Sequence, residues 1–163
     1  MNFRKILSIL LIIIWMITIF NFSHQQGTGS SKTSETVSRI IVNIYDINKH
    51  LNEEEKNELI EIINPIIRKM AHFTIYMLGG ILLINYIHLF LLEIEKEMLY
   101  SACIGIIYAI TDEIHQLFIV GRSGSIIDVL IDSIGIFTGI SIFLFINKIV
   151  IYIRNWAKLK GGE

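Results

Sequence analysis

Four long apolar stretches divide the chain into spanning and connecting parts. Residues 6–22 and 70–92 contain no Asp, Glu, Lys or Arg, and residues 98–119 and 126–146 contain no Lys or Arg. A helix needs roughly 20 predominantly apolar residues to cross a bilayer. The pattern therefore predicts an all-α, polytopic membrane protein in which residues 1–163 form a single domain with four transmembrane helices.

The first stretch, residues 6–22, follows Arg4 and Lys5. Cleaved signal peptides also carry basic residues before an apolar run, and they are the alternative here. The run is longer than their usual core of about 7 to 15 residues, and no small-x-small cleavage site follows it directly. We expect an uncleaved membrane anchor.

The segment between the first and second stretches, residues 23–64, is polar and is expected to be extracytoplasmic. Apolar residues recur in it at helical spacing, over residues 37–51 and again over residues 59–63. We expect two amphipathic helices that lie on the membrane surface or cover the mouth of the bundle. Asn64 and Pro65 suit an N-cap followed by a first helical residue, so we expect the second transmembrane helix to begin there.

The third stretch contains two carboxylates, Asp112 and Glu113. At the centre of a spanning helix each carboxylate costs about 2.5 to 3.5 kcal/mol of insertion free energy, whereas each Leu, Ile or Phe returns roughly 0.3 to 0.6 kcal/mol. We therefore expect both carboxylates to lie near one interface or to face partners inside the bundle.

The fourth stretch carries Asp128, Asp132, Gly135 and Gly139 on one stripe of a helix. Small residues four positions apart let helices approach closely, so this stripe is expected to face the bundle. The same Gly135 and Gly139 pair would also suit a contact between two copies of the chain, and we predict a homo-oligomer on that basis as the alternative.

Basic residues orient the chain in the membrane. The 14 Lys and Arg residues divide evenly between the presumed inner segments (1–5, 93–97 and 147–163) and the outer ones. Because the inner segments are shorter, their density of basic residues is about double, which favours the cytoplasmic side for them. We expect a multi-pass protein of the cell membrane with both termini in the cytoplasm.

The composition excludes several classes of protein. Hydrophobic residues make up 53% of the chain before its 11 glycines are added, and the sum exceeds the approximately 45–50% that is usual for soluble domains. The net charge of -1 leaves no strongly basic surface for nucleic acid. Cys103 is the single cysteine, so an intrachain disulfide and a thiolate zinc site are excluded.

With this orientation, polar residues from all four stretches meet at the extracytoplasmic end of the bundle. Arg and Lys side chains bind phosphate oxygens, and a histidine with an unperturbed pKa of about 6.5 transfers protons near neutral pH. The expected catalytic residues are His72, Asp112, Glu113 and His115. The expected ligand-binding residues are His24, Gln25, Arg68, Lys69, Gln116, Arg122, Ser125, Asp128 and Asp132.

Two other interpretations of these polar residues stay open. Arg122 with Asp128, or Arg68 with Asp112, would form structural ion pairs that hold helices together. Several of the same carboxylates and imidazoles also suit a divalent metal. Because neither His-x-x-x-His nor Cys-x-x-Cys spacing occurs in the chain, we expect no metal or other cofactor.

The polar motifs resemble those of the VanZ-like membrane proteins. The resemblance rests on Ser23-His24-Gln25, on Arg68-Lys69-Met70-Ala71-His72-Phe73 with Tyr76, and on Thr111-Asp112-Glu113-Ile114-His115-Gln116-Leu117-Phe118 followed by Gly121-Arg122-Ser123-Gly124-Ser125 and Asp128. It extends from the first apolar stretch to about residue 146. One position departs from the family pattern, because Val120 stands where proline is common.

The resemblance implies a small multi-spanning protein of the bacterial cell membrane. The VanZ-like family is associated with resistance to the glycopeptide antibiotic teicoplanin, and fold comparisons group it with enzymes that exchange or remodel lipid headgroups. By this analogy the motif positions are His72, Asp112, Glu113, His115, Arg122 and Asp128.

We therefore expect the protein to bind a membrane lipid or a polyprenyl-phosphate-linked intermediate of the cell envelope at the outer leaflet. Headgroup or phosphoryl exchange, by a transferase or hydrolase reaction, is the catalytic form of this hypothesis. The alternative is a non-enzymatic membrane protein that binds the antibiotic or an envelope partner.

Overall fold

The computed structural model describes residues 3–24, 27–47 and 50–160, and within them the chain is entirely helical apart from its connections. The prediction of an all-α fold is confirmed. The helices are α1 (Phe3–His24), α2 (Gly27–Asp46), α3 (Glu53–His88), α4 (Ile94–Gln116) and α5 (Ile126–Lys160).

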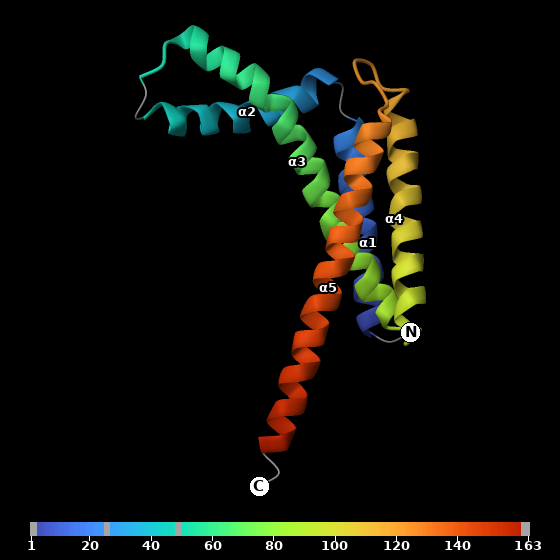
Figure 1. Ribbon diagram of the computed structural model, residues 1–163. Helices are drawn as coiled ribbons and strands as arrows, with labels where there is room; N and C mark the ends of the chain where they lie inside the picture. The colour runs from blue at the N-terminus through green and yellow to red at the C-terminus, as the bar shows by residue number, and fades with distance from the viewer. Residues whose placement is uncertain (1–2, 25–26, 48–49, 161–163) are drawn as a thin grey trace.

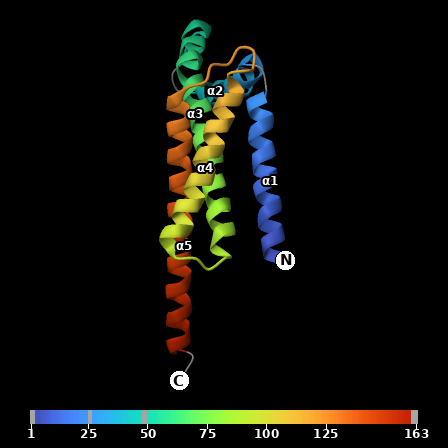
Figure 2. The same ribbon diagram turned by 90° about the vertical axis from the view of Figure 1, so that its right-hand side faces the viewer.

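A bundle forms the centre of the molecule. It contains α1, α4, the second half of α3 and the first half of α5, which run side by side (Figures 1 and 2). The loop between α4 and α5 lies at one end of the bundle, and the link between α3 and α4 lies at the other end, near the N-terminus. We call these the loop end and the terminal end.

Two parts of the chain project from the bundle. At the loop end, α2 and the beginning of α3 extend sideways together (Figure 1). At the terminal end, the second half of α5 continues past all the other helices. The buried core lies between these projections and includes Trp15, Tyr76, Ile84, Ile136 and Ile140.

α3 begins earlier than the sequence analysis predicted. Asn52 forms a capping box with Glu55: the Asn52 side chain accepts a hydrogen bond from the Glu55 amide at 2.9 Å, and the Glu55 side chain accepts one from the Asn52 amide at 2.9 Å. This cap satisfies two amides that a helix start leaves unpaired. The expected start at Asn64 is therefore wrong, and Pro65 lies inside one continuous helix.

α3 and α5 pack at backbone distance because glycines replace side chains between them. A Cβ atom on Gly135 would lie 2.6 Å from the backbone oxygen of Phe73, and one on Gly139 would overlap the backbone oxygen of Met77. On the other helix, a Cβ atom on Gly80 would overlap the backbone oxygen of Ile136. The glycine stripe of α5 faces the bundle, as predicted, and packs on α3 of the same chain. The homo-oligomer remains a prediction.

Three of the described helices, α1, α3 and α5, are long and apolar enough to cross a membrane, with mean hydropathies of 2.4, 1.5 and 2.3. The chain is thus a multi-pass membrane protein. α4, which contains the predicted span 98–119, does not reach the same combination of length and hydropathy. The fourth predicted span, residues 126–146, is the first part of α5, which continues as a helix to Lys160.

Candidate functional site

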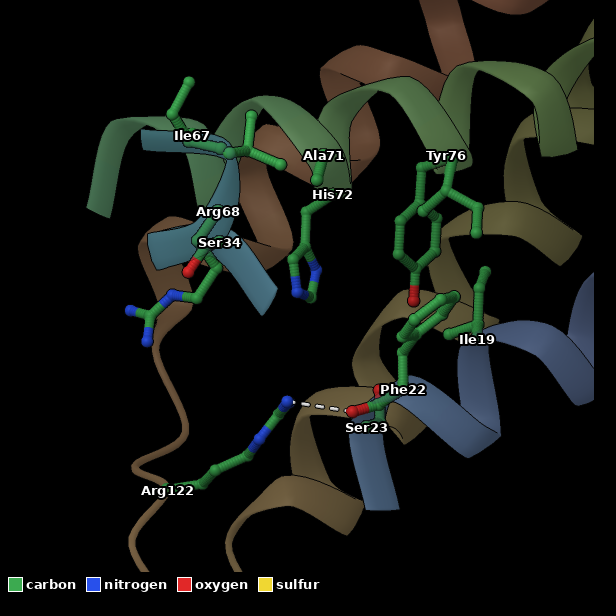
Figure 3. Close-up of a pocket in the computed structure, with 12 residues that line it drawn as sticks. Ile19, Phe22, Ser23, Ser34, Ile67, Arg68, Ala71, His72, Tyr76 and Arg122 are labelled. Atoms are coloured by element: carbon green, nitrogen blue, oxygen red, sulfur yellow. Dashed lines mark hydrogen bonds between the residues drawn. The ribbon is translucent and has the colours of Figure 1, made fainter. Parts of the chain in front are cut away.

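A cavity of about 220 Å³ lies at the loop end, where α1, α2, α3 and the α4–α5 loop meet. Figure 3 shows its lining. Three of its polar residues, Arg68, His72 and Tyr76, come from one face of α3, because they follow one another at intervals of four residues. The remaining lining residues are Ile19, Phe22, Ser23, Ser34, Val37, Ile67, Ala71, Ile75 and Arg122.

Two guanidinium groups border this cavity. Arg68 extends from α3, and Arg122 reaches in from the α4–α5 loop, where its Nη2 donates a hydrogen bond of 2.9 Å to the backbone oxygen of Phe22 (Figure 3). Burial lowers the pKa of Arg122, and the like charge of Arg68 lowers it further. Such a pair of cations favours an anion between or beside them.

The ion pairs of the described residues leave out both arginines, since none within 4.0 Å includes Arg68 or Arg122. The structural pairs Arg122–Asp128 and Arg68–Asp112, considered from the sequence, are therefore not formed. This leaves both guanidinium groups with donors for a ligand.

His72 contacts a deeply buried carboxylate on its far side. Its Nδ1 lies 3.7 Å from Oδ1 of Asp132, which belongs to α5 and is 0% exposed. No described group donates a hydrogen bond to either carboxylate oxygen of Asp132 or to the hydroxyl oxygen of Tyr76. Asp132 therefore lies behind His72 and does not line the cavity.

A second polar cluster links α1 and α4 beside the cavity. The Gln116 side-chain amide donates to Oδ2 of Asp112 at 3.1 Å and to the hydroxyl of Ser23 at 3.5 Å. All three residues are buried. Asp112 therefore lies inside the bundle, as its insertion cost required.

Glu113 fixes the loop that carries Arg122. Its Oε1 accepts a hydrogen bond of 2.6 Å from the backbone amide of Ser125, just before α5. In the same loop Gly121 has φ of 79°, a left-handed conformation that glycine adopts without strain. The structure places Glu113 and Ser125 where they hold the loop, and neither lines the cavity.

The other predicted residues lie outside the cavity lining. His24 Nδ1 is 3.4 Å from His115 Nε2, and both rings stack on Phe20 at the ends of α1 and α4. Lys69 is exposed on α3, and Asp128 is half-buried in the first turn of α5. Gln25 falls outside the described residues.

The predicted site residues did not include Tyr76 or any residue of α2. Tyr76 is a core residue, 0% exposed, and it also lines the cavity because its spacing from Arg68 and His72 places it on the same helix face. Ser34 and Val37 of α2 also line the cavity, and no local signal connected that helix with the others.

The terminal end holds a polar cluster that the sequence analysis did not predict. Glu97 is 2% exposed, and its Oε2 lies 2.8 Å from Nδ1 of His88. The other ring nitrogen of His88 lies 3.3 Å from Asn147 Nδ2. This cluster joins α3, α4 and α5 where the bundle ends.

A metal centre finds no support in the arrangement of side chains. Over residues 3–24, 27–47 and 50–160, no group of three or more His, Cys, Asp or Glu residues is placed to hold a metal ion. The chemistry of the cavity is that of cationic and neutral hydrogen-bond donors.

A family comparison covers both the bundle and the cavity. The family model described as VanZ/LLP1 matches residues 8–147. The chain belongs to the VanZ/LLP1 family. This match confirms the resemblance drawn from the polar motifs, and its range includes every residue that lines the cavity. No curated protein and no solved structure matches the chain.

Proposed function

We propose that this VanZ/LLP1 protein binds the phosphate-bearing headgroup of a membrane lipid or polyprenyl-phosphate-linked envelope intermediate. The observation that carries the proposal is that two guanidinium groups, those of Arg68 and Arg122, border one cavity and form no ion pair within 4.0 Å with any described carboxylate. Each guanidinium can bind two phosphate oxygens in a planar, bidentate arrangement. His72 and Tyr76 then lie deeper than the phosphate.

The size and walls of the cavity favour a lipid over a soluble phosphate compound. Its volume of about 220 Å³ is below the roughly 300–1,000 Å³ of sites that enclose a whole small molecule. Apolar side chains such as Ile67, Ile75 and Val37 form much of the wall. A headgroup enters such a space while its hydrocarbon chains remain in the bilayer.

We propose further that α4 is a fourth span. Its three buried carboxylates, Glu97, Asp112 and Glu113, are 2%, 5% and 6% exposed and so avoid lipid. The side chains on its outer face are apolar, including Ile107 and Ile114. Burying the charged groups inside the bundle removes most of the insertion cost that the sequence alone implied.

In this arrangement the loop end faces the outer leaflet and both termini are cytoplasmic. The density of basic residues in the terminal segments supports this orientation. α2 then lies along the outer membrane surface, because it projects sideways from the loop end (Figure 1). The headgroup site is open to lipids of that leaflet.

We propose that the same residues also support a phosphoryl transfer. The hydroxyl of an acceptor, either an alcohol or water, gives its proton to the neutral imidazole of His72 as its oxygen bonds to phosphorus. The bond from phosphorus to the leaving alcohol breaks, and the imidazolium returns the proton to that alcohol. Arg68 and Arg122 stabilise the negative charge on the phosphoryl oxygens. Altering a peptidoglycan precursor in this way would connect the protein with glycopeptide resistance.

Lipid-resolved mass spectrometry of the purified protein tests the binding proposal. We expect wild type to retain a phosphorylated lipid, and Arg68→Gln with Arg122→Gln to lose it by more than roughly tenfold, because truncating paired charges commonly costs several kcal/mol of binding. Lys69→Gln is the matched control, since it removes a neighbouring exposed charge that does not line the cavity. Equal lipid in all three proteins would refute the headgroup site.

The catalytic step needs a separate comparison. His72→Gln should retain the lipid but leave its headgroup unchanged, while His115→Gln should remain active because His115 lies outside the cavity lining. If turnover is instead lost with His115→Gln and kept with His72→Gln, the proton transfer belongs to His115 and the role proposed for His72 is wrong.

A further inference from the structure

The last part of α5 has no neighbour in the bundle. Asn147, which contacts His88, marks the end of the polar cluster at the terminal end. From Lys148 to Lys160 every residue is exposed. Figures 1 and 2 show this part of the helix beyond the ends of all the others.

α5 is too long to be explained by the membrane crossing alone. Its 35 residues extend about 52 Å at 1.5 Å per residue, whereas the hydrocarbon core of a bilayer is about 30 Å thick. The part from residue 126 to residue 147 already matches that thickness. Residues 148–160 therefore lie outside the hydrocarbon core.

This outer part, which we call the terminal helix segment (residues 148–160), is amphipathic. At 100° per residue, the residues from 148 to 159 divide into an apolar arc and an opposite arc that carries Lys148, Arg154, Asn155 and Lys158. Ile151 is the exception on the polar arc. Lys160, the last residue of the helix, is the exception on the apolar arc, where its Nζ lies 4.5 Å from the ring centroid of Trp156. The apolar arc consists of Ile149, Val150, Tyr152, Ile153, Trp156, Ala157 and Leu159.

The charge of the segment is entirely of one sign. Its charged residues are Lys148, Arg154, Lys158 and Lys160, and it contains no Asp or Glu. Within the described residues none of these four forms an ion pair within 4.0 Å. A parallel pair of such helices would bring like charges together, so charge opposes a second copy as the occupant of the apolar arc.

We propose that the terminal helix segment binds the anionic lipid surface at the terminal end of the bundle. The apolar arc, with its aromatic Tyr152 and Trp156, enters the boundary between headgroups and acyl chains, and the basic arc contacts lipid phosphates. Contact along the whole arc requires α5 to bend just after Asn147, where its contacts with the bundle end. The segment is thus an anionic-lipid sensor at the end opposite the headgroup cavity.

The test uses the full chain reconstituted in vesicles of phosphatidylcholine alone or with phosphatidylglycerol. Lipids brominated near the headgroup quench tryptophan that enters the interface, and subtracting the signal of Trp156→Phe leaves Trp156, because the other tryptophan, Trp15, is in the core. We expect quenching of Trp156 only with phosphatidylglycerol. High salt should remove it, since exposed charges are screened.

A pair of charge variants tests the electrostatic argument. Arg154→Gln with Lys158→Gln should lower the ratio of bound to unbound segment roughly 30-fold, because each basic residue near an anionic surface contributes about one factor of five. Arg4→Gln with Lys96→Gln is the matched control: it removes two charges from the same end of the molecule and leaves the segment intact.

Three results would overturn the inference. Equal quenching in both lipid mixtures would make the contact purely apolar, and absence of quenching in both would show that the segment stays away from lipid. Disulfide crosslinking of Ile153→Cys, on the apolar arc, in a Cys103→Ser background and without lipid quenching, would assign that arc to a second copy of the chain.

Discussion

The hydrogen bond between Glu113 and the Ser125 amide yields a prediction with a definite size. The bond joins a carboxylate to a backbone N–H at 2.6 Å in a partly buried place. A hydrogen bond to a charged group contributes about 1.5 to 3 kcal/mol. Glu113→Ala should therefore remove this stabilising free energy and release the loop that carries Arg122. Glu113→Gln should lose about half of that free energy, because its side chain keeps a neutral acceptor.

Amide hydrogen exchange of the protein in lipid nanodiscs measures this effect directly. At 1.36 kcal/mol per tenfold, exchange at Ser125 should accelerate by roughly 10- to 100-fold in Glu113→Ala. Retention of the phosphorylated lipid should fall as well, since Arg122 is no longer held at the cavity. Glu95→Ala, an exposed carboxylate of the same helix, is the control and should change neither quantity.

The sequence suggested a catalytic role for Glu113, and the same variants separate the two roles. If Glu113→Ala leaves exchange at Ser125 and lipid retention unchanged but abolishes headgroup turnover, the positioning role derived from the structure is wrong. Weakened retention with proportionate loss of turnover would support it.

Three more outcomes follow from the helix contacts. Gly139→Ala should lower the free energy of unfolding by about 2 kcal/mol, because overpacking costs up to about 3 kcal/mol and the better helix propensity of alanine returns about 1; unfolding in mixed micelles, with the exposed Ser141→Ala as control, measures this. Glu97→Ala should cost about 1–3 kcal/mol in the same assay, since it leaves His88 without its buried acceptor. The pKa of Asp46 lies below its usual 3.8, mainly because Lys56 donates a hydrogen bond to the carboxylate. The contribution of this ion pair to the stability of the α2–α3 corner is therefore complete above pH 3.8 and is lost as the pH falls through the lowered pKa. Proteolysis of the α2–α3 corner against pH should show this loss, and Asp46→Asn should abolish the dependence.

The parts of the fold that rest on local pattern could be predicted from the sequence. Apolar runs located α1 and the start of α5, and the spacing of Gly135 and Gly139 identified the face that packs on α3. The start of α3 was wrong because two capping signals compete in this region. Asn52 with Glu55 closes both hydrogen bonds of a capping box, whereas Pro65 is tolerated within the helix that follows.

The sequence predicted which end of the bundle carries the site, but it did not predict how the helices are rotated against one another there. Arg68, His72 and Arg122 were predicted to lie at the same end of the bundle, and all three line one cavity. The separation of His115 from that cavity depends on the rotation of α4 against its neighbours, which its even distribution of polar and apolar residues did not specify. The burial of Glu97 likewise depends on α5 passing beside it.

Pro65 gives the cavity a mechanical property that its lining alone does not have. Proline has no amide hydrogen, so the backbone oxygen of Glu61 lacks the usual donor four residues later, and this turn of α3 resists bending less than the rest. It lies one turn before Arg68, between the part of α3 that packs in the bundle and the part that carries α2. Rotation at this joint would swing α2 with its Ser34 and Val37 away from the bundle as a unit, widening the entrance while Arg122 and His72 stay in place.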